Sequence, residues 1–365
     1  MAEVAALSKY SCPACGAEAV WNASKQALVC PYCGTLSPAG VAEAAGPIKE
    51  HDLAEALRAI PGERRGWEAD RTSVQCQSCK AITLFQPGRI AARCEFCGSP
   101  AVVAYTATRA PIYPESLLPF TVPETAVREQ IRKWYASHWF APNKLKSRAL
   151  TDTVHGVYLP YWTFDASVEA DWRADSGYYY YETEQVRGSD GRMQTRQVRK
   201  TRWAASSGAV SHFFDDDMVP GTRGVDAGLL RQIEPFPARD LKPYDPAYVS
   251  GWVVEQYQID LVAAAERSRA QMDEKLRALC AGQVPGDTHR NLEVRADYSR
   301  QTFKHLLNPV WLLNYTYGSR TFQCVVNGCT GTIAGRYPIS WIKVLLVVLA
   351  GLIAILIFLA LNQSA

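Results

Sequence analysis

Eight cysteines in the first hundred residues form four Cys-x-x-Cys pairs, and their spacing constrains the fold more than any other feature of the chain. The second two pairs repeat the first two at an offset of 64 residues, and each set leaves 14 residues between its inner cysteines. Two such knuckles, joined by a short hairpin, supply four thiolates to one metal ion. We therefore predict two structural zinc ions, held by Cys12, Cys15, Cys30 and Cys33 and by Cys76, Cys79, Cys94 and Cys97.

Four thiolates close the coordination shell of a zinc ion, so neither predicted site keeps an open position for water or a substrate. A ribbon of about 30 residues buries little core, and metal binding must supply much of its folding free energy. The alternative is a disulfide framework, which belongs to secreted chains, and the first residues show no signal peptide. We expect structural zinc and predict no catalytic residue.

Three cysteines lie outside these pairs, namely Cys280, Cys324 and Cys329. Cys324 and Cys329 flank a Val-Val-Asn-Gly turn and could face each other as a weak third metal or thiol site. The alternative is that they are unrelated, partly buried thiols.

The carboxyl-terminal residues are the second constraining feature. Residues 344–361 read VLLVVLAGLIAILIFLAL, which is 18 residues without a polar side chain. As a helix this stretch is about 27 Å long, close to the roughly 30 Å of a bilayer core. A basic and aromatic flank precedes it, and a buried core helix is the alternative. We predict a single-pass, tail-anchored membrane protein with its bulk in the reducing cytoplasm.

The rest of the chain predicts a folded body with many aromatic residues. The net charge of +3 on 75 charged residues gives no general electrostatic argument for nucleic-acid binding. The predicted fold class is α+β, with two tandem four-cysteine zinc ribbons, an antiparallel-sheet body and one carboxyl-terminal transmembrane helix. The expected domains are ribbon one (1–36), a linker with a short helix (37–70), ribbon two (71–104), the α+β body (105–337) and the membrane anchor (338–365).

Within the body, the apolar periodicity predicts a helix opened by Pro123 and further helices at Asp226–Ile233 and Gln258–Cys280. Strands at Tyr178–Val186 and Met193–Trp203 form a long hairpin, with Asp190-Gly191 as its tight turn. The hairpin is rich in arginine. It is either a contact for anionic headgroups or nucleic acid, or a solvated edge protected by charge.

The motifs of several enzyme classes are missing from the sequence. No Gly-x-x-x-x-Gly-Lys-Ser/Thr, His-Glu-x-x-His or Gly-x-Ser-x-Gly occurs. We therefore expect a protein that is not an enzyme. An enzyme using the 105–337 body would need a deep pocket with convergent titratable groups.

The order of motifs resembles a known family. Two zinc ribbons come first, Gly156-Val-Tyr-Leu-Pro-Tyr-Trp-Thr-Phe-Asp165 lies mid-chain, and a segment from Val325 to Ser340 leads into the apolar terminus. This pattern resembles the bacterial transcription-factor-IIB-type zinc-ribbon membrane proteins, whose members are often labelled primosomal helicase-like. The resemblance implies a location at the inner membrane of bacteria. It also implies partners of the flotillin-like or phage-shock type.

Together these features predict a zinc-stabilised adaptor that recruits cytosolic partners to the inner face of the membrane, with envelope stress as its expected setting. The alternative is a nucleic-acid-binding zinc-ribbon protein related to replication or transcription, without motor activity. Basic residues near the knuckles are few, which supports that alternative only weakly.

Overall fold

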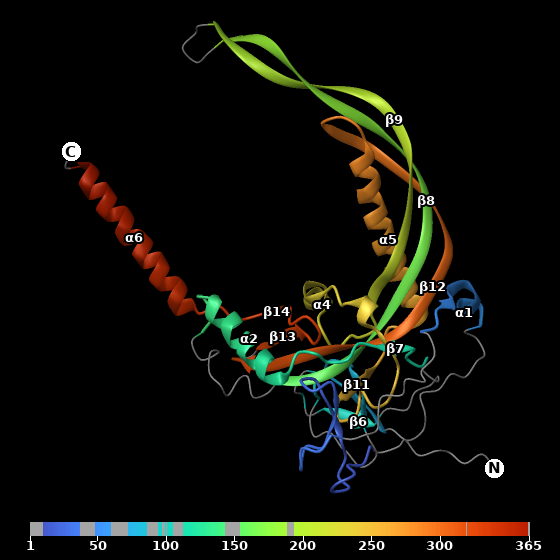
Figure 1. Cartoon of the computed structure of the whole chain (residues 1–365). Coiled ribbons are helices and arrows are strands. Elements are labelled where there is room, and N and C mark those ends of the chain that lie inside the picture. Colours follow the sequence, from blue (N-terminus) through green and yellow to red (C-terminus); the bar gives the residue numbers. More distant parts are fainter. Residues whose placement is uncertain are drawn as a thin grey trace.

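The computed structural model describes residues 10–36, 48–59, 72–85, 94–96, 99, 101–104, 112–142, 154–187, 193–318 and 320–363. Strands dominate this part of the chain, and the longest of them curve together through the whole molecule (Figure 1). Twelve strands belong to one sheet, and β1 and β2 form a separate two-stranded sheet.

Three very long strands form the backbone of the fold, namely β8 (Val154–Arg187), β9 (Met193–Pro220) and β12 (Thr288–Tyr317). β8 is the middle strand, and it pairs antiparallel with β9 on one side and β12 on the other. With 34 residues, β8 follows a path of about 110 Å. It pairs with β12 only as far as Gly177, so the far part of the β8–β9 hairpin is two-stranded.

β-Bulges accompany the curvature of these strands. The register shifts between Phe164 and Ala166 on β8, and at two places on β12. At the shifts, Asp216, Asn291 and Arg300 have φ angles of 51°, 53° and 49°. Bulges bend a strand and increase its twist, which accounts for the arc in Figure 1.

Shorter strands extend the sheet from both sides of the β8–β12 pair. The path runs β10-β7-β12-β8-β11-β5-β4-β6, and β3, β9, β13 and β14 attach beside it. Their bounds are β3 His51–Asp52, β4 Thr72–Cys76, β5 Ile82–Phe85, β6 Val102–Ala104, β7 Ser116–Leu117, β10 Lys242–Pro243, β11 Val253–Gln256, β13 Arg320–Asn327 and β14 Ile333–Gly335.

The helices cover parts of this sheet. α5 (Leu261–Gln283) lies along the long strands and buries Ala264, Met272 and Leu276 against them. The remaining helices are α1 (Leu53–Ala59), α2 (Glu124–Ser137), α4 (Ala227–Ile233), the 3-10 turn η2 (Ala238–Asp240) and α6 (Trp341–Gln363). The helices expected after Pro123, at 226–233 and at 258–280 therefore match α2, α4 and α5.

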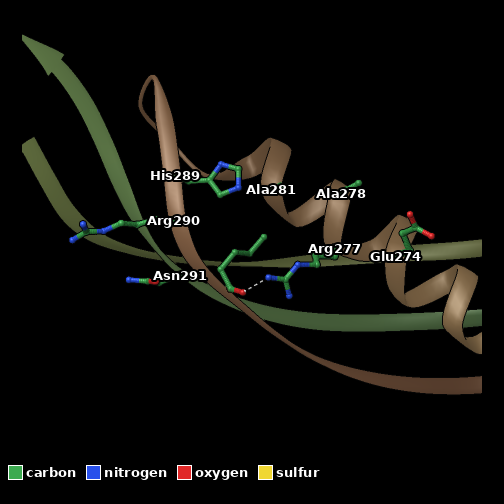
Figure 2. A pocket seen from close by; sticks show the side chains of 8 residues that line it. Glu274, Arg277, Ala278, Ala281, His289, Arg290 and Asn291 are labelled. Carbon is green, nitrogen blue, oxygen red and sulfur yellow. Dashed lines mark hydrogen bonds between the residues drawn. The ribbon is translucent and has the colours of Figure 1, made fainter. Parts of the chain in front are cut away.

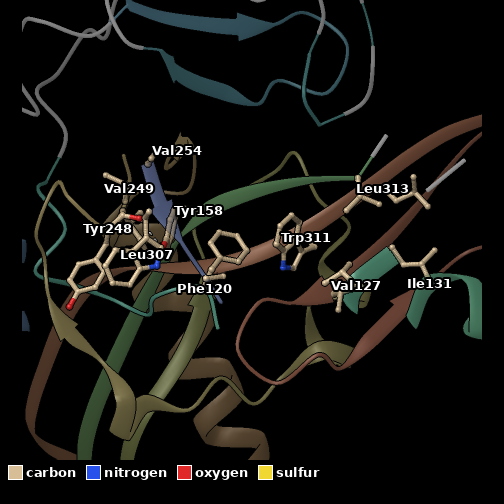
Figure 3. Close-up of a cluster of buried hydrophobic side chains, with 14 of the residues drawn as sticks. Phe120, Val127, Ile131, Tyr158, Tyr248, Val249, Val254, Leu307, Trp311 and Leu313 are labelled. Carbon is tan, nitrogen blue, oxygen red and sulfur yellow. Dashed lines mark hydrogen bonds between the residues drawn. The ribbon is translucent and has the colours of Figure 1, made fainter. Parts of the chain in front are cut away.

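Buried apolar side chains form three clusters on the two faces of the sheet. One cluster unites Phe120, Tyr158 and Trp311 with α2, as Figure 3 shows. Phe120 stacks on Trp252 with ring centroids 4.2 Å apart. This cluster also contains Trp21 of the first ribbon, so the first ribbon packs against the body's core.

The predicted fold class is wrong in its main features. Strands outweigh helices, so α+β understates the β content. The sheet is mixed, because β11 pairs parallel with β8 and β7 pairs parallel with β12. The second ribbon is also not a separate unit, since its strands β4, β5 and β6 belong to the twelve-stranded sheet.

The expected transmembrane anchor is also not supported. No helix among the described residues has the length and apolar character required to cross a membrane. For α6, the described side chains end at Ile357. The prediction of a single-pass protein of the bacterial inner membrane, which rested on that anchor, is corrected accordingly.

Candidate metal centres

The first cysteine cluster brings all four predicted ligands together. The Sγ atoms of Cys12, Cys15, Cys30 and Cys33 lie within 4.8 Å of one another. Cys12 Sγ is 3.5 Å from Cys33 Sγ, and Cys15 Sγ is 3.5 Å from Cys30 Sγ. Cys12 and Cys30 are buried, whereas Cys15 and Cys33 are exposed. The group could hold a metal ion with one side of the site facing solvent.

Each knuckle of this cluster is closed by the same pair of backbone hydrogen bonds. Cys12 N donates to Ala17 O at 2.6 Å, and Gly16 N donates to Cys12 O at 2.8 Å. The knuckle that begins at Cys30 repeats both bonds. Gly16 and Gly34 have φ angles of 73° and 74°, which glycine adopts readily. Glycine at this place lets the chain turn sharply after the second cysteine.

The second cluster joins the three predicted ligands that the structure describes. The Sγ atoms of Cys76, Cys79 and Cys94 lie within 4.8 Å of one another, and those of Cys79 and Cys94 are 3.6 Å apart. The fourth predicted ligand, Cys97, is outside the described residues. Lys80 takes the place of the knuckle glycine with φ 64°, and its N donates to Cys76 O at 2.9 Å. The turn therefore has the same shape as in the first ribbon, although a lysine replaces the glycine.

The sulfurs of the first cluster are suited to a cation. Their separations are far longer than the roughly 2.05 Å of a disulfide, and all four are free thiols. Hydrogen bonding with the side chain and backbone of Thr35 lowers the pKa of Cys33 to about 6. A hydrogen bond with the backbone of Ala17 lowers the pKa of Cys15. The hydrogen bonds between the Cys15 thiol and the neighbouring sulfurs outweigh that effect, and the pKa of Cys15 is raised to about 12. Four crowded thiols cannot all ionise unless a cation balances them.

The first ribbon attaches to the body mainly through side chains, and Trp21 N also donates a backbone hydrogen bond to Ser250 O at 3.2 Å. Its hairpin pairs β1 (Val20–Asn22) with β2 (Ala27–Val29) and buries Trp21 against Tyr248, with ring centroids 4.6 Å apart. Ser250 Oγ donates to Ala19 O at 2.8 Å, and Trp252 Nε1 donates to Trp21 O at 3.2 Å. The apolar side of this ribbon is thus covered by the 248–252 segment.

The second ribbon attaches through backbone pairing. β5 pairs antiparallel with β11, which in turn pairs with β8 of the long hairpin. Between the ribbon and the body lies Glu255, which is fully buried. Its Oε1 accepts a hydrogen bond from Gln258 Nε2 at 2.6 Å. Burial raises the pKa of Glu255 to about 8, against the opposing effect of bonds from Thr222 and Gln258.

The three remaining cysteines do not form a site among the described residues. Cys324 is fully buried beside Trp134 and Gly335. Cys329 belongs to a different cluster, where its Sγ lies 3.6 Å from Pro119 O. Burial raises the pKa of each of these two thiols to about 12. Cys280 is buried against the long strands. These are core thiols.

Two polar groups of structural importance had no sequence signal. Glu255 reads as an ordinary strand residue, and only the distant ribbon buries it. Lys304 is only 8 % exposed and pairs with Glu50 at 3.0 Å and Asp216 at 2.8 Å. Because these partners come from segments far apart in the chain, local periodicity could not reveal them.

A cavity of about 410 Å³ lies between the end of α5 and the start of β12 (Figure 2). Its lining includes Arg277, His289 and Arg290. Arg277 Nη2 donates to Leu292 O at 2.8 Å, and Arg290 pairs with Asp175 at 3.1 Å. Both guanidinium groups are thus engaged in the fold, and no cysteine lines the cavity.

Comparison with known proteins yields one distant relative and no family. No family model matches the chain, and no solved structure matches it. The chain is 23% identical over 233 residues to a Bacillus subtilis (strain 168) protein named "Uncharacterized protein YdjG". The alignment covers 63% of this chain and 65% of that relative. The likeness therefore extends over most of the chain, and its printed name carries no activity.

Proposed function

We propose that this protein is a zinc-stabilised scaffold that binds partner proteins, and that its metal ions are structural. The observation that carries the proposal is that both ribbons are built into the body. The first supplies Trp21 to the central core, and the second supplies strands to the main sheet. Metal sites with this placement hold a surface together and are poorly placed for chemistry.

The geometry of the sulfurs supports zinc as the metal. Tetrahedral zinc with Zn–S bonds of about 2.3 Å has S···S edges of roughly 3.8 Å. Two pairs of the first cluster are 3.5 Å apart, and all four sulfurs lie within 4.8 Å of one another. The two 3.5 Å edges would lengthen by only about 0.3 Å to match the tetrahedron. The same comparison applies to the 3.6 Å separation of Cys79 and Cys94 in the second cluster, with Cys97 as the fourth ligand.

The long curved sheet supports a binding role. The three-stranded section of β8, β9 and β12 exposes the face opposite α5, and the two-stranded arm beyond it is exposed on both faces. Figure 1 shows how far these strands extend. Extended, rigid surfaces of this kind suit recognition of other macromolecules. The family resemblance suggests flotillin-like or phage-shock-type proteins as partners.

The alternative of nucleic-acid binding by the ribbons is favoured less. The inner side of the first ribbon is covered by the 248–252 segment, and β5 of the second is paired with β11. Neither surface is available to a nucleic acid.

Two measurements on the full chain test the proposal. Metal analysis after purification under reducing conditions should return about two zinc ions per chain, as the two four-cysteine sites require. Purified flotillin-like or phage-shock-type proteins should form a saturable complex with the intact chain, and a Cys76→Ser variant should lose it. Far less than two equivalents of zinc, or the absence of any saturable complex, would overturn the proposal.

A further inference from the structure

The far end of the β8–β9 hairpin is a two-stranded arm with both faces exposed. The arm comprises residues 178–187 and 193–202, which lie beyond the last pair of β8 with β12 at Gly177 and Thr288. Ten residues on each strand give it a length of about 33 Å. Figure 1 shows it projecting away from the rest of the sheet.

The register divides the arm into two faces of different character. One face, which we call the paired face, presents Tyr178, Tyr180, Glu182, Glu184, Arg196, Val198, Lys200 and Arg202. On it, Lys200 Nζ lies 2.5 Å from Glu182 and 2.8 Å from Glu184. Its carboxylates are therefore engaged with lysine, and part of its positive charge is neutralised.

The opposite face has no carboxylate among its described side chains. This aromatic face presents Tyr179, Tyr181, Thr183, Gln185, Thr195, Gln197, Arg199 and Thr201. Arg199 places its guanidinium 4.3 Å from the ring centroid of Tyr179, and no described carboxylate pairs with it. Tyr181 is 66% exposed. Aromatic rings and an unneutralised cation are thus displayed to solvent.

A third aromatic ring continues this face at the base of the arm. Trp203 lies opposite Gly177, on the same side as Tyr179, and Arg290 sits 4.1 Å from its ring centroid. The carboxylates near the base are engaged elsewhere. Asp175 binds Arg290 and Asn291, and Asp287 accepts the Tyr179 N–H at 2.7 Å.

We propose that the aromatic face binds single-stranded nucleic acid, with Tyr179 and Tyr181 as stacking platforms and Arg199 as a phosphate contact. The arm contains five basic and two acidic residues, so its net charge of +3 equals that of the whole chain. Side chains on one face of a strand repeat about every 6.7 Å, a spacing that unstacked bases of an extended strand can adopt. Exposed aromatic rings beside arginine are the usual means of binding single strands without sequence preference.

An acidic peptide would match the charge of the arm but would have no planar groups to cover the two exposed tyrosine rings. A duplex would present stacked bases, whose faces are not accessible to tyrosine. The observations therefore favour a single strand over both. This binding goes beyond the proposed protein scaffold, and either could fail without the other.

The test uses the full chain and a fluorescein-labelled 20-nucleotide oligo(dT) in an anisotropy titration at two salt concentrations. Tyr179→Ser with Tyr181→Ser should weaken binding at least about 10-fold. The matched control, Tyr178→Ser with Tyr180→Ser, removes the same two groups from the paired face and should change binding less than about threefold. Raising the salt should weaken binding by the wild type.

A second pair of variants gives the same contrast without removing aromatic rings. Arg199→Gln should weaken binding more than Lys200→Gln, because both remove one positive charge from the arm but only Arg199 lies on the aromatic face. Equal melting temperatures will confirm that all variants fold. No oligo(dT) binding, equal losses from both faces, or equally tight binding of a poly-glutamate peptide with the same dependence on Tyr179 and Tyr181 would overturn the proposal.

Discussion

The two cysteine ribbons have the same spacing, and the three knuckles that the structure describes in full share the same hydrogen bonds, but the ribbons attach to the body differently. The first keeps its own two-stranded sheet and docks through buried side chains such as Trp21. The second gives its strands to the twelve-stranded sheet through the β5–β11 pairing. The first ribbon is therefore held mainly by side-chain packing, and the second is held by backbone hydrogen bonds between paired strands.

This difference determines how much of the fold should be destabilised when one metal ion is lost. A docked unit can open locally while the rest of a protein stays folded. A ladder strand cannot leave without unpairing its neighbours, since buried backbone groups lose their hydrogen bonds. The two ribbons meet the same short stretch of chain, because Ser250 and Trp252 contact the first while Val254 and Glu255 pair with the second. The first metal site should therefore protect a local unit, and the second should protect the body.

Removing one ligand from each site provides the strongest contrast. Cys76→Ser should lower the free energy of global unfolding by more than about 4 kcal/mol, because metal binding supplies the folding free energy of small zinc units. Cys12→Ser should lower it by only about 1–2 kcal/mol, since the first ribbon can detach alone. Denaturant unfolding with zinc analysis of each variant measures both effects. Equal losses, or a larger loss from Cys12→Ser, would contradict the comparison.

Two glycines at the contacts between ribbon and body provide the next contrast. A Cβ at Gly251 would lie 2.4 Å from Val20 of the first ribbon, where φ is +79°. A Cβ at Gly224 would lie 2.9 Å from Ala81 of the second. Both alanine variants should cost about 1–3 kcal/mol through overpacking, with Gly251→Ala at the upper end because of its backbone conformation.

Hydrogen exchange separates the consequences of these two variants. Gly251→Ala should speed exchange mainly in residues 10–36, whereas Gly224→Ala should speed it in the second ribbon and in β11 as well. If exchange in β11 is faster in Gly251→Ala but unchanged in Gly224→Ala, the first ribbon and not the second is coupled to the sheet.

The carboxyl group beneath the second ribbon predicts a pH dependence. The pKa of Glu255 rises from 4.5 to about 8 on folding, because the ribbon buries it. Between these values the unfolded chain has released a proton that the folded chain retains, so stability falls as the pH rises. The slope is at most about 1.4 kcal/mol per pH unit. Glu255→Gln keeps the shape and the acceptor for Gln258, and should flatten this slope between pH 6 and 8 in thermal unfolding. An unchanged slope would mean that another group titrates.

Local features of the fold could be predicted from the sequence. The cysteine spacing located the knuckles, and Asp226 and Asp260 cap α4 and α5 by accepting hydrogen bonds from backbone amides within three residues. The pairing of β5 with β11 joins segments about 170 residues apart and had no such signal. The bulge at Asp165 had no such signal either: β8 continues through it, and the carboxylate accepts hydrogen bonds from Asp216 N and the Thr302 hydroxyl, which come from two other strands.

The third knuckle shows the same limit at one residue and gives the smallest expected effect. A lysine at position 80 is unfavourable for the turn that glycine allows, yet Lys80 adopts φ 64° and keeps the knuckle hydrogen bonds. A non-glycine residue in this conformation carries strain that glycine avoids. Lys80→Gly should therefore raise the free energy of unfolding by about 0.5–1 kcal/mol. Gly34→Ala, the reverse change in the first ribbon, should lower it by a similar amount if that ribbon is coupled to global unfolding, and by less if it opens locally. Chemical denaturation of the two variants therefore tests whether the first ribbon unfolds together with the sheet. If Gly34→Ala lowers the free energy of unfolding by as much as Lys80→Gly raises it, the first ribbon is coupled to global unfolding.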